Sequence, residues 1–82
     1  MTIGERLLRE RRRRNLTQQA LAELSGVSQG LIARIERGQV KDPASSVVRR
    51  ISRALGISVD YLVGMYDDDP ASSEHALVGA PG

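Results

Sequence analysis

A single glycine between two short amphipathic segments constrains this fold more than any other feature of the sequence. Gly26 follows one helix-like segment and precedes another, and so short a turn makes the two helices cross steeply with their backbones nearly in contact. A small side chain is then required at the crossing, and Ala22 stands four residues before the glycine. The apolar residues spaced to fill the flanks of the crossing are Leu21, Val27, Ile32 and Ile35.

Helix caps and stops divide residues 3 to 64 into five predicted helices, without a strand signal. Thr2 and Glu5 have the spacing of a capping box, and Leu7 and Leu8 are expected to face inward from the first helix. The predicted helices run from Ile3 to about Arg14, from the cap Thr17 to Gly26, from the cap Ser28 to Gly38, from the cap Asp42 and Pro43 to Gly56, and from the cap Ser58 to Gly64. The expected fold class is therefore all-α.

The composition excludes several classes of function. The chain of 82 residues has no Cys, Trp or Phe, which excludes disulfides, thiolate metal sites and cysteine nucleophiles and makes the core aliphatic. His75 stands alone, and no acid pair, nucleophile with a base, or phosphate loop accompanies it, so we expect neither an enzyme nor a cofactor or metal. No apolar run is long enough for a signal peptide or a membrane span, so the expected location is the cytoplasm.

The charges divide the chain into two parts. Residues 1–66 hold all 12 Lys and Arg residues against six of the ten acids, a net charge of +6, whereas residues 67–82 hold four acids and no Lys or Arg. A basic domain favours a polyanionic partner. The acidic part is too polar to bury enough surface, so we interpret it as a disordered tail. It could serve as a solubilising end, or it could fold back on the basic face as a mimic of phosphate.

The outward side of the third predicted helix suits the major groove of DNA. Gly30 and Ala33 leave clearance for the helix to approach the base edges. Gln29 can pair with adenine N6 and N7, and Arg34 can bridge guanine O6 and N7. These four residues are therefore the predicted base-reading set, with double-stranded DNA as the partner.

Residues around this helix are placed to hold the DNA backbone. Arg11 lies on the apolar side of the first helix, so its charge needs either Glu36 as an ion-pair partner or a route by which its head reaches water. The start of the second helix offers free backbone N–H groups that suit a phosphate. The predicted phosphate contacts are Arg11, Thr17, Gln18, Ser28, Arg37 and Lys41.

Over residues 3 to 64 the chain resembles the Cro and phage-repressor (Xre-type) helix-turn-helix family. The matching pieces are "LTQQALA", "IERG" and "ALGIS", which stand in the family's order and at its separations. The resemblance implies a compact five-helix lambda-repressor-like domain over residues 1–66, dimeric operator binding and transcriptional repression. Gly30 and Leu24 depart from it, since relatives usually carry polar side chains there, as does Ser45, where many have an aliphatic one.

Two functional hypotheses remain open. In the first, a homodimer represses transcription from a two-fold operator, because one short reading helix offers too few base contacts. The apolar residues left for its interface are Val59, Tyr61, Met65 and Tyr66, although the core could equally take them. In the second, the domain is an antitoxin or another protein-binding module whose tail, with Ala76, Leu77 and Val78, contacts a protein partner.

Overall fold

Five helices joined by short turns make up residues 1–65, the part of the chain that the computed structural model describes. Strands are absent from this part, so the all-α prediction is confirmed. The helices are α1 (Ile3–Arg13), α2 (Gln18–Ser25), α3 (Gln29–Glu36), α4 (Ser45–Leu55) and α5 (Val59–Leu62). The predictions for Tyr66 and for the tail of residues 67–82 lie outside the described residues.

The helix starts follow from the capping residues that the sequence supplies. Thr2 and Glu5 form both bonds of a capping box at α1, with Thr2 N donating to Glu5 Oε1 at 2.8 Å and Glu5 N to Thr2 Oγ1 at 3.1 Å. The hydroxyls of Thr17, Ser28 and Ser58 accept backbone N–H groups at the starts of α2, α3 and α5. The predicted starts of these four helices are confirmed.

The start of α4 differs from the prediction. Asp42 and Pro43 do not begin the helix; its N-cap is Ala44, with ψ at 147° and no side-chain hydrogen bond. An extended residue spans about 3.3 Å of chain and a helical one about 1.5 Å. The extended Ala44 ahead of Ser45 therefore lengthens the connection between α3 and α4, and the local preference of proline for the first helical turn is not realised.

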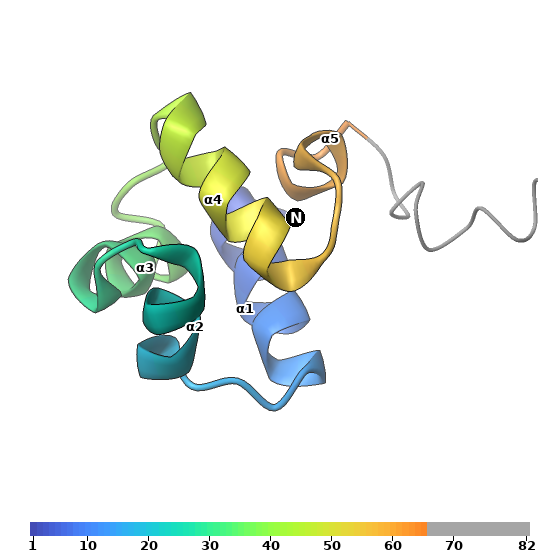
Figure 1. The fold of residues 1–82 in the computed structure, drawn as a ribbon. Helices are drawn as coiled ribbons and strands as arrows, with labels where there is room; N and C mark the ends of the chain where they lie inside the picture. Colours follow the sequence, from blue (N-terminus) through green and yellow to red (C-terminus); the bar gives the residue numbers. More distant parts are fainter. Residues whose placement is uncertain (66–82) are drawn as a thin grey trace, which may run out of the picture.

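The helices enclose one aliphatic core. In Figure 1, α2 and α3 lie on one side of α4 and α5 on the other, with α1 passing behind. The buried core residues are Leu7, Leu21, Val27, Ile32, Ile35, Val48, Ile51, Leu55, Ile57, Tyr61 and Leu62. The four residues predicted to flank the corner between α2 and α3 are all among them, so that prediction is confirmed.

The glycine Gly4 sets the distance between α1 and α3. A Cβ atom at this position would lie 2.1 Å from the carbonyl oxygen of Ile35 and 3.1 Å from that of Glu36. Both obstacles are backbone atoms at the end of α3, so no side-chain rearrangement could make room. Gly4 thus allows two helix backbones to touch, a role that was not predicted from the sequence.

The inward face of α1 differs from the one predicted. Leu7 is buried, but Leu8 is only half-buried and lines a surface hollow of about 440 Å³ with Glu5, Arg9, Arg12 and Arg13. In place of Leu8, the polar residues Arg6 and Glu10 are buried. The prediction for Leu8 is wrong because the face of α1 that meets α5 receives a polar group, the hydroxyl of Tyr61.

Tyr61 belongs to the core, which corrects its assignment to a dimer interface. Its side chain is 3% exposed, and its hydroxyl donates to Glu10 Oε2 at 2.6 Å. Arg9 Nη2 donates to the same hydroxyl oxygen, and the guanidinium groups of Arg6 and Arg9 lie 5.6 and 6.0 Å from the ring centre. The ring is therefore fully engaged within the subunit.

Glu10 is the carboxylate on which this polar cluster depends. It accepts hydrogen bonds from Tyr61, from Arg14 Nη1 at 2.8 Å and from Arg13 Nη1 at 3.2 Å. Burial raises the pKa of Glu10, but the hydrogen bonds from Tyr61 and Arg14 outweigh burial, so the pKa lies below its ordinary value. The folded protein therefore favours the charged form of Glu10.

The lowered pKa predicts a specific loss of stability in acid. A carboxylate with a depressed pKa in the folded state stabilises the fold fully above its unfolded pKa, about 4.3, and loses this contribution as the pH falls through the folded pKa. Glu10→Gln should cost about 2 kcal/mol at pH 7 and make stability fall less steeply below pH 4. Urea unfolding between pH 2.5 and 7 measures both. Glu23→Gln, at an exposed position, is the control. If stability falls equally steeply below pH 4 in Glu10→Gln and in wild type, the lowered pKa of Glu10 is contradicted.

Candidate nucleic-acid interface

The outer edge of α3 carries the predicted base-reading residues. Ile32 and Ile35 are 0% and 1% exposed and fix the inner side of the helix. Gln29, Gly30 and Arg34 are exposed on the opposite side, and Ala33 is half-buried beside them. Nothing lies within 4 Å of the position that a Cβ atom of Gly30 would occupy. The edge is thus slim, open and polar.

The corner that presents this edge is held by Gly26. Its φ angle is 74°, in the left-handed region, and its N–H donates to the carbonyl oxygen of Ala22 at 2.9 Å. A residue with a Cβ atom is strained in that conformation. The tight turn places the start of α3 directly after the end of α2, as the spacing of the sequence predicted.

Glu36 joins three helices at one carboxylate. Arg11 Nε donates to Oε2 at 2.7 Å and Arg11 Nη2 to Oε1 at 2.9 Å, a bidentate pair whose side chains are 11% and 5% exposed. Gln18 Nε2, at the start of α2, donates to Oε1 at 3.0 Å. The predicted pair of Arg11 and Glu36 is therefore present, and the bond to Gln18 is an addition that helical periodicity could not reveal.

The side chains predicted to contact phosphates differ in how many hydrogen-bond donors they keep free. Arg11 also donates through Nη1 to the carbonyl oxygen of Leu16 at 2.8 Å, so three of its five N–H groups have partners. The hydroxyls of Thr17 and Ser28 accept cap bonds and keep their O–H groups as donors. Arg37 and Lys41 are exposed.

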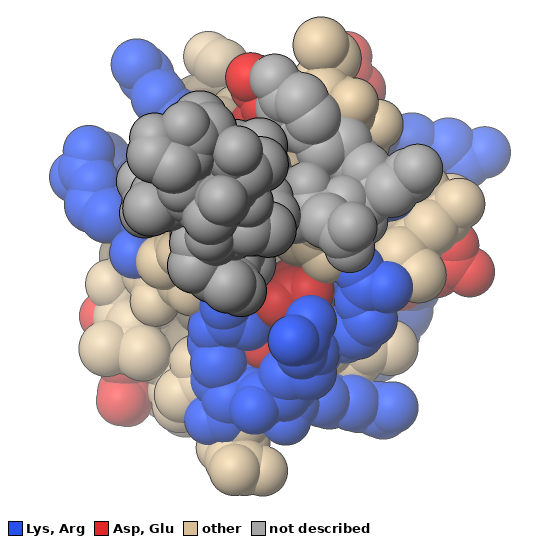
Figure 2. All heavy atoms as spheres, turned by 90° about the vertical axis from the view of Figure 1, so that its right-hand side faces the viewer, with Lys and Arg blue, Asp and Glu red and all other residues tan. Residues whose placement is uncertain are grey.

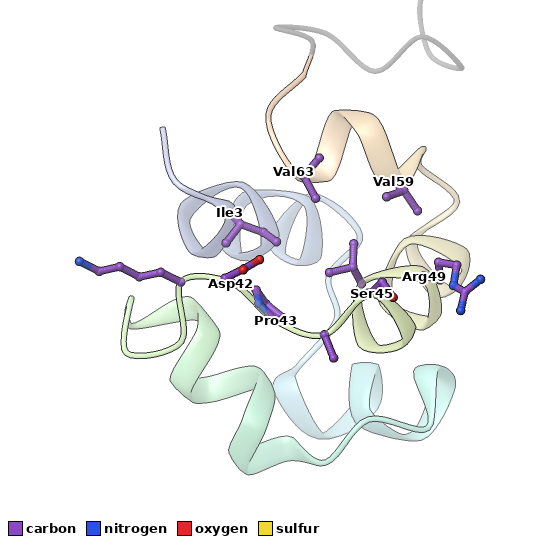
Figure 3. A pocket seen from close by; sticks show the side chains of 10 residues that line it. Ile3, Asp42, Pro43, Ser45, Arg49, Val59 and Val63 are labelled. Carbon is purple, nitrogen blue, oxygen red and sulfur yellow. The ribbon is translucent and has the colours of Figure 1, made fainter.

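A surface hollow lies where the loop before α4 meets α1 and α5, away from the outer edge of α3 (Figure 3). It was not predicted from the sequence. Its volume is about 770 Å³, and its apolar lining is Ile3, Pro43, Ala44, Val48, Val59 and Val63. Lys41, Asp42, Ser45 and Arg49 add polar groups. None of the predicted base-reading residues lines it.

Residues 1–65 contain neither a cluster of metal-binding side chains nor a membrane-spanning helix. His, Cys, Asp and Glu side chains do not gather there in groups of three that could hold a metal ion. In the same part of the chain, no helix has the length and apolar character needed to cross a bilayer.

Comparison with known proteins gives matches over most of the chain. A helix-turn-helix family model matches residues 6–62. The immunity repressor protein of Bacillus phage phi105 is 41% identical over 64 residues, which cover 78% of this chain and 44% of that protein. An uncharacterized HTH-type transcriptional regulator of Sinorhizobium fredii is 34% identical over 68 residues, which cover 83% of this chain and 87% of the regulator. The chain therefore spans less than half the length of the phage relative.

Two solved structures share the fold. The P22 c2 repressor protein, in complex with synthetic operator 9T, superposes with a TM-score of 0.73 at 33% identity, over 78% of this chain and 96% of that one. The SinR protein/SinI protein complex gives a TM-score of 0.75 at 25% identity, over 96% of this chain and 78% of that one.

Proposed function

The chain belongs to the Xre-type helix-turn-helix family, and from this premise we propose that it is a sequence-specific DNA-binding repressor of transcription. Its relatives support this proposal, since one is a phage immunity repressor and another is a repressor solved with an operator. The proposed activity is binding and not catalysis. Its place would be the cytoplasm, with the nucleoid when DNA is bound.

The exposed edge of α3 is the observation that carries the proposal. Two fully buried isoleucines fix the helix against the core, so its other side is presented rigidly to solvent. The open space at Gly30 would let the backbone approach the base edges, while Gln29 and Arg34 supply the donor and acceptor pattern for adenine and guanine. Arg11, Thr17, Gln18, Ser28, Arg37 and Lys41 would hold the flanking phosphates.

The proposed active form is a homodimer on a two-fold operator. Its two reading helices would enter half-sites about 34 Å apart, or a multiple of that distance. Met65 is 69% exposed and Val59 is half-buried nearby in sequence, which leaves both available to a second copy. Tyr61 is not available, because it is buried.

Selection of bound sites from random double-stranded DNA, at physiological salt, tests the proposal directly. The expected result is an enriched two-fold motif whose repeat distance gives the half-site spacing. A protein that enriches no sequence, at physiological or at low salt, would refute the proposal.

Lys41 offers a test of the phosphate contacts. Lys41→Ala should weaken binding to specific and random DNA by the same factor, because a phosphate contact carries no sequence information. The negative slope of log K against log salt should become shallower by about one unit. Titrations at several salt concentrations measure this. Arg53→Ala, which removes an exposed charge on α4, is the matched control, and an equal change in its slope would show that only net charge matters.

A second candidate function is protein binding, with the same domain serving a partner as an antitoxin does. The observation that favours it is the structural match to a complex of two proteins. Failure of the DNA selection, together with a monomeric folded protein, would make this candidate the leading one.

A further inference from the structure

A basic surface lies on the side of the molecule where α1 meets α5, away from the outer edge of α3, which is called the reading edge below. Figure 2 shows basic side chains gathered around a small acidic area on this face. The ion pairs and ring contacts identify Arg6, Arg9, Arg13 and Arg14 around Glu10 and Tyr61, which we name the arginine cluster. Three of these four cations share the Glu10 carboxylate and Arg6 has no ion pair with it, so the cluster carries an excess of positive charge.

Arg6 is the least compensated member of the arginine cluster. It is only 8% exposed, its Nε is buried without a hydrogen-bond partner, and no ion pair of Arg6 exists within residues 1–65. The Tyr61 ring at 5.6 Å is the group that compensates its charge in part. Buried guanidinium groups ordinarily have an anionic partner, because burial without one is costly.

The two acids of α1 do not form an ion pair with Arg6. Glu10 already accepts from Tyr61, Arg13 and Arg14, and lies 3.5 Å from Arg9 Nε. The backbone hydrogen bond from Thr2 and, to a smaller extent, the charge of Arg6 lower the pKa of Glu5, but its carboxylate is held in the capping box by Thr2 N. Arg6 therefore lacks an ion-pair partner among the acids of residues 1–65, and Arg9 shares Glu10 with two other arginines.

The path of the chain after α5 indicates which residues could supply an anionic partner for Arg6. Arg6 Nη1 lies 3.0 Å from the position that a Cβ atom of Gly64 would take, so the chain passes this guanidinium immediately after α5. Asp67, Asp68 and Asp69 follow only three to five residues later. Three residues span at most about 10 Å, so the length of the chain is compatible with contact between these carboxylates and the arginine cluster.

We propose that the arginine cluster is the docking site of the acidic segment Asp67–Asp69 of this same chain. The segment would give Arg6 an ion-pair partner and Arg9 a second one beside Glu10, and would tie the end of α5 to α1. The charge complementarity is large, since residues 67–82 contain four acids and no Lys or Arg. The proposal is independent of DNA binding, because the cluster contains none of the residues assigned to the reading edge.

Neutralising the segment tests the proposal with little disturbance of the fold. The variant Asp67→Asn, Asp68→Asn, Asp69→Asn should unfold more easily at 20 mM salt, with an unfolding equilibrium constant raised on the order of fivefold. In 1 M salt, where the Debye length is about 3 Å, the difference from wild type should largely vanish. Urea unfolding at the two salt concentrations measures both values.

A double-mutant cycle identifies the partner of the segment. In an Arg6→Gln background the neutralised segment should cause little further loss, whereas in an Arg34→Gln background, an exposed arginine on α3, it should cause the full loss. If Arg6→Gln does not fold, Arg9→Gln takes its place. Independently, NMR resonances of the Arg6 and Arg9 Nε–H groups should shift when the segment is neutralised.

Three outcomes would overturn the proposal. The first is unchanged stability at low salt with unmoved arginine resonances. The second is an equal effect in the Arg6 and Arg34 backgrounds, which would mean a general effect of net charge. The third is that inorganic phosphate shifts the Arg6 and Arg9 resonances equally in wild type and in the neutralised variant, which would make the cluster a site for external anions.

Discussion

Replacing Gly4 with alanine should cost about 3 kcal/mol or more of folding free energy. The added methyl group would lie 2.1 Å from the Ile35 carbonyl oxygen, so α1 and α3 would have to separate. Separation would in turn stretch the bonds between Arg11 and Glu36 and open the core beside Ile35. A domain of this size has only about 3 to 10 kcal/mol of stability, so the variant should be partly or wholly unfolded at 37 °C.

The matched control for this prediction is Gly30→Ala. Both glycines are the second residue of their helix, but a Cβ atom at Gly30 meets nothing within 4 Å. The change should raise stability by about 0.5 to 1 kcal/mol, through the better helix propensity of alanine. Thermal unfolding followed by circular dichroism compares the two. A Gly4→Ala protein as stable as wild type would show that α1 and α3 do not approach as described.

The second large effect is expected for the double variant Gln29→Ala, Arg34→Ala. Each side chain is proposed to form a bidentate contact with a base, worth about 1 to 3 kcal/mol of discrimination. Loss of both should reduce the preference for the selected operator over random DNA by about 30-fold or more. The fold should be unaffected, because both side chains are exposed.

Competition titrations with operator and random DNA at one salt concentration measure the preference. Arg53→Ala, an exposed arginine on α4, controls for the lost charge and should weaken both DNAs equally without changing their ratio. A double variant whose operator-to-random ratio equals that of wild type would remove α3 from the role of sequence reader.

Much of the fold was predictable because local chemistry determines it. The caps Thr2, Thr17, Ser28 and Ser58 fix where four helices begin, and Gly26 fixes the corner between α2 and α3. Each of these signals depends on residues within four positions of one another. The edge of α3 was predictable for the same reason, since the buried isoleucines define which side remains outside.

The features that were not predicted depend on contacts between distant parts of the chain. Glu10 is buried because Tyr61, 51 residues later, donates to it, whereas helical periodicity extended the inward face of α1 to Leu8, which lies on another side of the helix. The extended conformation of Ala44, which delays the start of α4, has no local signal in the sequence. Gly4 did carry a signal, because a glycine inside a helix is unfavourable unless close packing requires it.

The carboxylate shared by Arg11 and Gln18 also has a consequence for selectivity. Glu36 lies at the end of α3, and its two partners lie on α1 and at the start of α2. The relative positions of the three helices are therefore fixed before DNA binds. Such a surface loses little conformational entropy on docking. Such a surface also adapts little to a groove of different shape. The free-energy cost of mismatched contacts at a noncognate site would therefore not be reduced by rearrangement of the helices.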